Sequence, residues 1–234
     1  MNDATAVERH SVVPLKAHRK LTRRHESQMK AAAAQSAGRL TDEIVPVITP
    51  AGQVVDRDTC LRPQTTLAGL AALKPVFLTD GSVTAGTASP LTDGATAVLV
   101  TSAHFAARRG VRVMAKVKGV AVAGCEPEFM GMGPVPATRK ALARAGLSMA
   151  EIDVVEINAA FGSQAVACVR ELGIDRRRVN IDGGAIALGH PLGATGARIT
   201  AKAAQILERE GGRYALAARC IGGGQGIATI LEAV

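Results

Sequence analysis

The stretch GGAIALGHPLGATGAR at residues 183–198 decides how the surrounding chain is organised. Its glycines are too dense for the interior of a regular helix or strand, so the stretch predicts a loop between two regular elements. Residues Ala197–Glu210 then carry strong helix formers up to Gly211 and predict a long helix. The loop therefore places His190, surrounded by small residues, close to the start of a helix.

Strands and helices alternate on both sides of this loop. Apolar, β-branched runs predict strands, and runs of helix formers that end at glycine predict helices. The predicted strands are Val111–Val122, Ile152–Ile157, Tyr214–Ala218 and Ile227–Leu231, and the predicted helices are Phe161–Leu172 and one that starts at Pro134 and continues over Ala137–Ala145. This alternation is typical of an α/β architecture in which helices cover a sheet.

The composition changes near residue 110, and the earlier part is less regular. Residues 26–37 predict a helix that ends at Gly38, and residues 65–73 predict a short one. The Ala/Val/Leu run at Gly94–Ser102 is interpreted as a buried helix. Residues 1–24 are interpreted as a basic, solvated leader, because Lys and Arg outnumber acids near the N-terminus.

The overall composition excludes several classes of protein. The chain has 234 residues, 47% of them hydrophobic, which argues against disorder, a collagen-like repeat or a disulfide-dense mini-protein. Only 2% of the residues are aromatic, which disfavours a stacking surface for nucleic acid. No apolar run approaches the roughly 20 residues of a membrane span. The net charge, 28 − 20 = +8, suits an anionic partner such as a phosphorylated cofactor.

The four cysteines form no CxxC pair and no zinc-site spacing. They are interpreted as reduced thiols in a cytoplasmic protein that has no metal site. Cys60, Cys125 and Cys168 are interpreted as small, buried apolar residues with a structural role only.

Three glycine-framed stretches place polar residues at the ends of predicted elements. They are EINAAF at 156–161, GGAIALGHPLG at 183–193 and CIGGGQG at 220–226. Ligands of α/β sheets bind beyond the carboxyl ends of strands, so the three stretches could converge there. A histidine base, a thiol and closely approaching glycine amides are the groups that acyl transfer requires.

Each of these residues also has a simpler interpretation. His190 and its neighbours could form only a turn, Cys220 could be a small buried hydrophobe, and Asn158 could merely cap the following helix. A basic leader could bind nucleic acid, although it lacks interleaved aromatics and a recognisable motif.

The same stretches carry a resemblance to the thiolase family, the acyl-CoA C-acyltransferases. GGAIALGHPLGATGAR at 183–198 and CIGGGQG at 220–226 are similar to family motifs, as are NAAF at 158–161, MGMGPVPA at 130–137 and VTAGTASPLTDGA at 83–95. The resemblance runs in colinear order from about residue 25 to the C-terminus. It implies the layered α/β thiolase-type fold, with residues 110–234 as a complete C-terminal domain and residues 25–109 as incomplete parts of the loop and N-terminal domains.

The resemblance also implies a reaction, the thiolytic cleavage of 3-oxoacyl-CoA or the reverse Claisen condensation of acetyl-CoA. His190 matches the histidine that activates a nucleophilic cysteine, and Cys220 matches the cysteine that moves the α-carbon proton. The main-chain amide of Gly222 and a water held by Asn158 match the two oxyanion holes.

Further family positions match residues that contact CoA or substrate. They are Ser89, Met130, Arg62 and Phe161. CoA is then a substrate, no cofactor is tightly bound, and a homo-oligomer is expected.

Two departures from the family pattern limit this interpretation. Ala159 stands where the family motif NEAF has glutamate, and no stretch resembles the motif of the acylated cysteine. Because covalent catalysis requires that thiolate, we expect the chain to hold the acid–base half of a site and to need another polypeptide for the nucleophile half. The alternative is a non-catalytic CoA-binding or subunit-interaction module, or a degenerate thiolase fragment.

Overall fold

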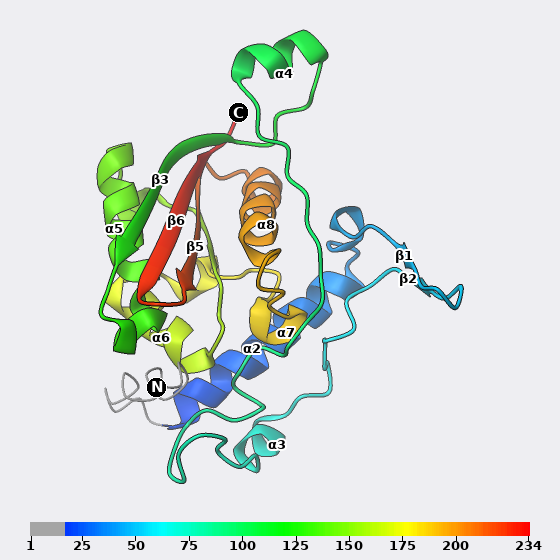
Figure 1. Cartoon of the computed structure of the whole chain (residues 1–234), viewed down its shortest axis with the longest axis vertical. Helices are drawn as coiled ribbons and strands as arrows, with labels where there is room; N and C mark the ends of the chain where they lie inside the picture. The colour runs from blue at the N-terminus through cyan, green and yellow to red at the C-terminus, as the bar shows by residue number, and fades with distance from the viewer. Residues whose placement is uncertain (1–16) are drawn as a thin grey trace.

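The computed structural model describes residues 17–234 and contains one mixed four-stranded sheet (Figure 1). The strands lie in the order β3 (Lys116–Gly124), β6 (Gln225–Glu232), β5 (Tyr214–Ile221) and β4 (Val154–Ile157). β4 pairs with β5 in parallel, whereas β5–β6 and β6–β3 are antiparallel. The predicted α/β architecture is confirmed.

Helices α5 (Pro134–Ala145) and α6 (Gly162–Glu171) cover one face of the sheet. Their apolar residues pack against alternate residues of all four strands, such as Ile157, Leu216 and Ile230, which are at most 1% exposed. Burying a side chain of this size stabilises the fold by about 1.5–3 kcal/mol. This face holds the larger of the apolar clusters.

Helix α8 (Thr195–Glu210) covers only part of the opposite face. It packs against β4 and β5 through Ile199, Ile206 and Leu207. Three valines of β3 that face the same side are 40–54% exposed: Val117, Val120 and Val122. The outer part of this face therefore presents apolar side chains to solvent.

The N-terminal part of the chain wraps around this body. The elements are α2 (Ala17–Ser36), η1 (Thr41–Glu43), β1 (Val47–Ile48), β2 (Val54–Val55), α3 (Leu67–Ala71) and α4 (Ala103–Arg109). Ala31 and Ala34 of α2 pack against Ala187 and Leu188 of the short helix α7 (Ala185–Leu188). Helix α2 thus lies directly on the glycine-rich stretch, below it in Figure 1.

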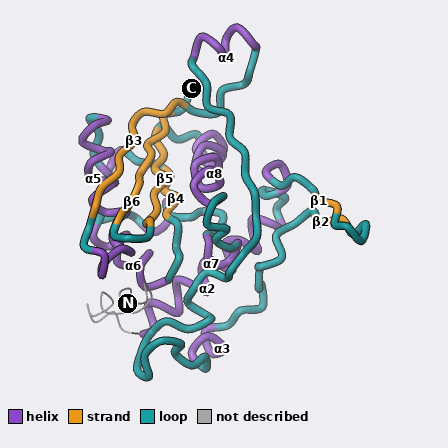
Figure 2. The backbone as a smooth tube through the Cα atoms, viewed as in Figure 1, coloured by secondary structure: helices purple, strands orange, loops and turns teal. Residues whose placement is uncertain are grey.

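The interpretation of Gly94–Ser102 as a buried helix is wrong. Residues 91–102 form an extended segment that belongs to no helix or strand (Figure 2). Val98, Leu99 and Val100 are 44–77% exposed. A short apolar run without polar spacing fits a buried strand as well as a helix, so its periodicity could not distinguish the two.

Most other predicted elements are present with shifted ends. The first helix begins at Ala17, within the region interpreted as a leader, and residues 1–16 of that leader lie outside the described residues. The strand predicted from Val111 begins only at Lys116, and the glycine-rich loop contains the unpredicted α7. The remaining short helices are η2 (Pro127–Met132), η3 (Met149–Glu151) and η4 (Arg176–Arg178). No helix within residues 17–234 is long and apolar enough to cross a membrane.

The turn between β5 and β6 is fixed by contact between two backbones. A Cβ on Gly226 would lie 2.0 Å from the carbonyl oxygen of Gly133, and a Cβ on Gly133 would lie 2.3 Å from that of Gln225. No side chain can occupy either position without moving the other backbone. These two glycines therefore hold the turn against the start of α5.

Replacing Gly226 by alanine should therefore destabilise the chain. We expect Gly226→Ala to lower the free energy of unfolding by about 1–3 kcal/mol, because the new methyl group would clash with the backbone of Gly133. Urea denaturation followed by circular dichroism measures this change. Gly193→Ala is the matched control, since nothing lies within 4 Å of its added Cβ. Equal stability of the two variants would contradict the expectation.

Candidate active site

The backbone of His190 is held by a residue from the extended segment. Its amide donates to Thr92 Oγ1 at 2.9 Å, and the Thr92 hydroxyl donates to the carbonyl of Pro90 at 2.8 Å. Gly189 has φ +94°, and a Cβ there would lie 2.4 Å from Thr92 Oγ1, so this position requires glycine. Thr96 adds a second bond to the same loop, donating to Ala194 O at 2.7 Å.

The hydrogen bonds of the imidazole define its tautomer. Nδ1 lies 2.7 Å from Thr195 Oγ1, and the Thr195 hydroxyl donates its only hydrogen to Pro191 O. Thr195 must therefore accept from His190, which puts the ring proton on Nδ1. Nε2 is left with a lone pair, toward which Asn158 Nδ2 donates at 3.2 Å. This arrangement presents Nε2 as the basic nitrogen.

The surroundings of His190 favour the neutral ring. Burial, together with the positive charges of Arg198 and Arg219, lowers the pKa of His190 below its ordinary value of 6.5. Arg198 also donates to Gly189 O at 3.3 Å, so this cation belongs to the same loop. A neutral imidazole at physiological pH is the form that can accept a proton.

Asn158 lies at the carboxyl end of β4 and is 1% exposed. Its amide nitrogen donates to Ala218 O on β5 at 2.9 Å, which continues the parallel pairing. Its side-chain Oδ1 is buried and has no partner within the structure. An unpaired buried amide oxygen is a position for a water molecule or a ligand donor. The interpretation of Asn158 as a simple helix cap fails, because α6 has no side-chain cap.

Ser89 and Phe161 lie beside Asn158 in a short antiparallel contact. Ala88 bridges to Phe161, and Ser89 N donates to Ala160 O at 2.8 Å. The structure therefore brings four predicted site residues together: Ser89, Asn158, Phe161 and His190.

Cys220 and Gly222 lie at the end of β5. Strand alternation puts Cys220 on the face shared by Leu216 and Ala218, toward Cys168 of α6. A Cβ on Gly222 would meet nothing within 4 Å, so the space beside this residue is open. The turn adjoins the histidine loop, because Arg219 donates to Leu192 O at 3.3 Å.

The other cysteines differ in burial. Only Cys168 fits the expectation of a small buried hydrophobe, and burial raises its pKa to about 12. Cys60 and Cys125 are partly exposed, so that assignment is wrong for them. Burial, with the nearby charges of Asp58 and Glu126 respectively, raises the pKa of both thiols.

Arg62 lines a cavity of about 200 Å³ together with Arg24, Cys60, Ala88 and Ile186. Arg24 is 4% exposed and donates to the carbonyls of Ala85 and Ala88. Burial, and then the charge of Arg62, lowers the pKa of Arg24 to about 10. Two guanidinium groups at one cavity suit an anionic ligand.

Met130 lies elsewhere, partly buried in η2. The adjacent Gly131 O accepts from the thiol of Cys168 at 3.3 Å, which ties η2 to α6. Ala159, at the position of the family glutamate, is 5% exposed and packs with Ala165 and Ile186. No carboxylate occupies that place.

The sequence did not point to Thr92, Thr195 or Arg24. Thr92 and Arg24 act across long sequence separations, and Thr195 looks like an ordinary first-turn helix residue. Within residues 17–234 no three His, Cys, Asp or Glu side chains are grouped as a metal ion would require.

The structure is thus that of an α/β protein in which a histidine and an asparagine meet at the end of a strand, beside glycine-rich turns. The family profile described as "Thiolase, C-terminal domain" matches residues 111–233, and that described as "Thiolase, N-terminal domain" matches residues 25–104. The chain belongs to the thiolase family, which is a family of acyltransferases.

Individual relatives support the same assignment. Over 214 residues the chain is 49% identical to a 3-ketoacyl-CoA thiolase of Vibrio vulnificus and 51% identical to a 3-oxoadipyl-CoA/3-oxo-5,6-dehydrosuberyl-CoA thiolase of Escherichia coli. The matches cover 88% and 89% of this chain but 55% and 53% of those relatives. The chain therefore spans about half their length.

A solved structure agrees in fold. Human mitochondrial 3-ketoacyl-CoA thiolase in complex with CoA superposes with a TM-score of 0.96 at 44% identity. The superposition covers 99% of this chain and 58% of the human protein.

The cations around His190 lead to a pH prediction. Replacing Arg219 by glutamine removes a positive charge that disfavours the imidazolium, so the pKa of His190 should rise toward 6.5. NMR titration of the ring protons measures the change, and Arg139→Gln is the control because its charge does not act on His190. An unchanged or lower pKa in Arg219→Gln would contradict this expectation.

Proposed function

We propose that this chain supplies the acid–base and oxyanion-binding part of a thiolase site that acts on 3-oxoacyl-CoA. The observation that carries the proposal is the chain of hydrogen bonds from Thr195 through His190 to Asn158, which leaves a basic Nε2 at the site. The acyl-accepting cysteine would come from a thiolase N-terminal half. In this function residues 110–234 act as the C-terminal domain and residues 25–109 belong to the loop and N-terminal domains.

Each group would have one step in the reaction. His190 would take the proton of the incoming cysteine thiol at Nε2, and Cys220 would move the proton at the substrate α-carbon. The amide of Gly222 and a donor held by Asn158 would stabilise the two oxyanions. Thiolysis and Claisen condensation use the same groups in opposite order.

CoA would enter beside Arg62. The guanidinium groups of Arg62 and Arg24 offer positive charge at a cavity that Ala88 also lines, next to Ser89. Phe161 pairs with the same segment, so the acyl and pantetheine ends would lie on one path past Ser89. Met130 would contribute to the acyl pocket. CoA acts here as a substrate, with no tightly bound cofactor.

An N-terminal half would also cover apolar surface that is exposed here. Val98, Leu99 and Val100 lie on an extended segment, and Val117, Val120 and Val122 line the open part of the sheet. Covering these six side chains would remove a large apolar area from water. A cytoplasmic location would fit the four cysteines, none of which forms a disulfide, and a homo-oligomer would fit the family resemblance.

Complementation tests the proposed function. Mixing the purified chain with a separately produced N-terminal half of a 3-ketoacyl-CoA thiolase should give CoA-dependent loss of 3-oxoacyl-CoA that neither part gives alone. His190→Asn should lower the rate of the mixture by about 10²–10⁴-fold, because the general base is gone. Robust thiolysis by the chain alone, with an acyl adduct on one of its four cysteines, would overturn the proposal.

Calorimetry with CoA separates this function from the alternative. The chain should bind CoA, and Arg62→Gln should weaken binding by roughly tenfold or more, because a charge-assisted hydrogen bond is lost. Arg57→Gln changes another exposed arginine of the same region and should leave CoA binding unchanged. CoA binding without activity in the complementation mixture would favour a binding module, and absence of both would indicate a degenerate fragment.

A further inference from the structure

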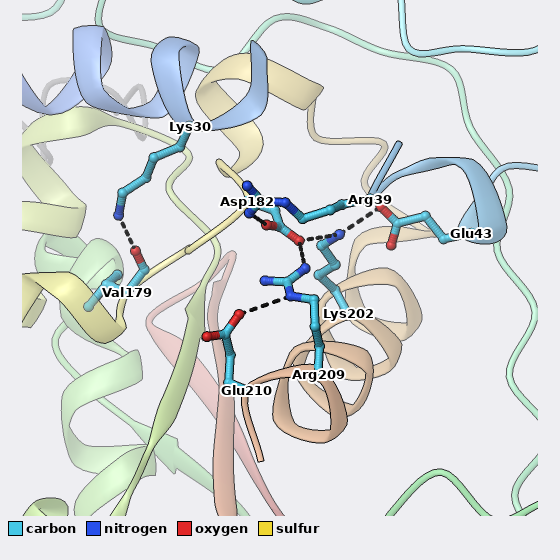
Figure 3. Close-up of polar contacts among 8 residues, drawn as sticks. All are labelled: Lys30, Arg39, Glu43, Val179, Asp182, Lys202, Arg209 and Glu210. Atoms are coloured by element: carbon cyan, nitrogen blue, oxygen red, sulfur yellow. Dashed lines mark hydrogen bonds and ion pairs between the residues drawn. The ribbon is translucent and has the colours of Figure 1, made fainter. Parts of the chain in front are cut away.

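Asp182 is a buried carboxylate surrounded by three cations (Figure 3). Its side chain is 0% exposed, and it pairs with Arg39 Nη1 at 3.0 Å, Lys202 Nζ at 2.9 Å and Arg209 Nη1 at 2.6 Å. Arg39 follows α2, whereas Lys202 and Arg209 lie on α8. The Asp182 side chain therefore connects helix α8 and the turn after α2 to the start of the glycine-rich stretch.

The charges of this cluster balance. Lys202 also pairs with Glu43 at 2.9 Å, and Arg209 with Glu210 at 2.9 Å. Three cations thus face three anions. Burial opposes the ionisation of Asp182, but hydrogen bonds from Arg209 and Lys202 outweigh it and lower its pKa. The side chain of Lys202 is 4% exposed, so loss of the Asp182 charge would leave this cation with Glu43 alone.

Asp182 lies eight residues before His190, and the residues between them have little freedom. Gly184 N donates to Ser27 Oγ at 3.2 Å, and Gln28 Nε2 donates to Ile186 O at 3.3 Å. Both partners belong to α2, which also carries Lys30, a donor to Val179 O at 2.8 Å. Residues 184–188, the middle of the segment 182–190, therefore lie along α2.

The same segment meets α8 at two separate points. At one end Asp182 pairs with Lys202 and Arg209, and at the other His190 Nδ1 donates to Thr195 Oγ1. Thr195 is in the first turn of α8, and Lys202 lies about two turns further along. Two contacts on one helix fix both the position and the orientation of the segment between them.

We propose that Asp182 is a positioning residue for His190. Through Lys202 and Arg209 it sets where the segment 182–190 lies along α8, and thereby whether His190 Nδ1 reaches Thr195 Oγ1. The role of His190 as a base rests on the proposed function above, but the positioning of its ring does not.

The test measures the imidazole directly in the full chain. Nitrogen-15 NMR of the histidine rings gives widely separated shifts for a single fixed tautomer and averaged shifts for an exchanging mixture. The wild-type chain should show His190 as the Nδ1–H tautomer, with His190→Asn used to assign the signal. Asp182→Asn should average the two shifts, and Thr195→Val, which removes the direct acceptor, should do the same.

Two further variants separate positioning from folding. Glu171→Gln removes the exposed ion pair with Arg139 and should leave the His190 signals unchanged. If Asp182→Asn does not fold, the double variant Asp182→Asn/Lys202→Met also removes the uncompensated cation. The same NMR measurement on the double variant then tests whether Asp182 positions His190. A folded Asp182 variant with unchanged His190 signals would overturn the proposal.

Activity in the complementation mixture distinguishes this inference from the proposed function. A catalytic mixture should lose at least tenfold in kcat with Asp182→Asn, while KM for CoA stays within about twofold. A wild-type mixture without activity would count against the proposed function only, since the NMR result would still decide the role of Asp182.

Discussion

The parallel pairing of β4 with β5 sets the geometry on which the site depends. Because both strands run in the same direction, their carboxyl ends meet at one edge of the sheet. Asn158 follows one strand, and Cys220 is the next-to-last residue of the other. The hydrogen bond from Asn158 N to Ala218 O fixes their relative register. A strand slipped by one residue would turn each side chain to the other face of the sheet. His190 lies between helices α7 and α8, which place it at that edge.

Much of this arrangement could be predicted from local sequence. The glycine-rich stretch, the helix after it and the strand before the final turn all follow from residue types within a few positions. The contacts that hold His190 could not, because Thr92 is 98 residues away from it in sequence. The role of Asp182 could not be predicted either, because its three cations come from two other segments, Arg39 after α2 and two residues of α8, and because buried carboxylates are uncommon. The prediction of a helix over residues 94–102 was wrong for a different reason. The conformation of this segment depends on what packs against it rather than on its own periodicity.

The electrostatic potential at the site is more positive than its charged residues alone indicate. Arg198 and Arg219 act on His190, while the nearest buried carboxyl along β4, Glu156, does not offset them at neutral pH. Burial raises the pKa of Glu156 to about 8, so this group is mostly protonated near pH 7. The result is a neutral imidazole in a field that favours negative charge.

Such a field is suited to a thiolate. Positive charge lowers the pKa of a neighbouring cysteine, yet burial raises the pKa of Cys60, Cys125 and Cys168. Under the proposed function Cys220 moves a proton at the substrate, so it cannot also carry the acyl group through that step. Under the proposed function, His190 Nε2, whose lone pair is directed at Asn158 Nδ2, and the unpaired Asn158 Oδ1 would both lie next to the place where the incoming cysteine and the thioester meet. Under the proposed function, the apolar sheet face beside β3 would pack against the part that carries that cysteine.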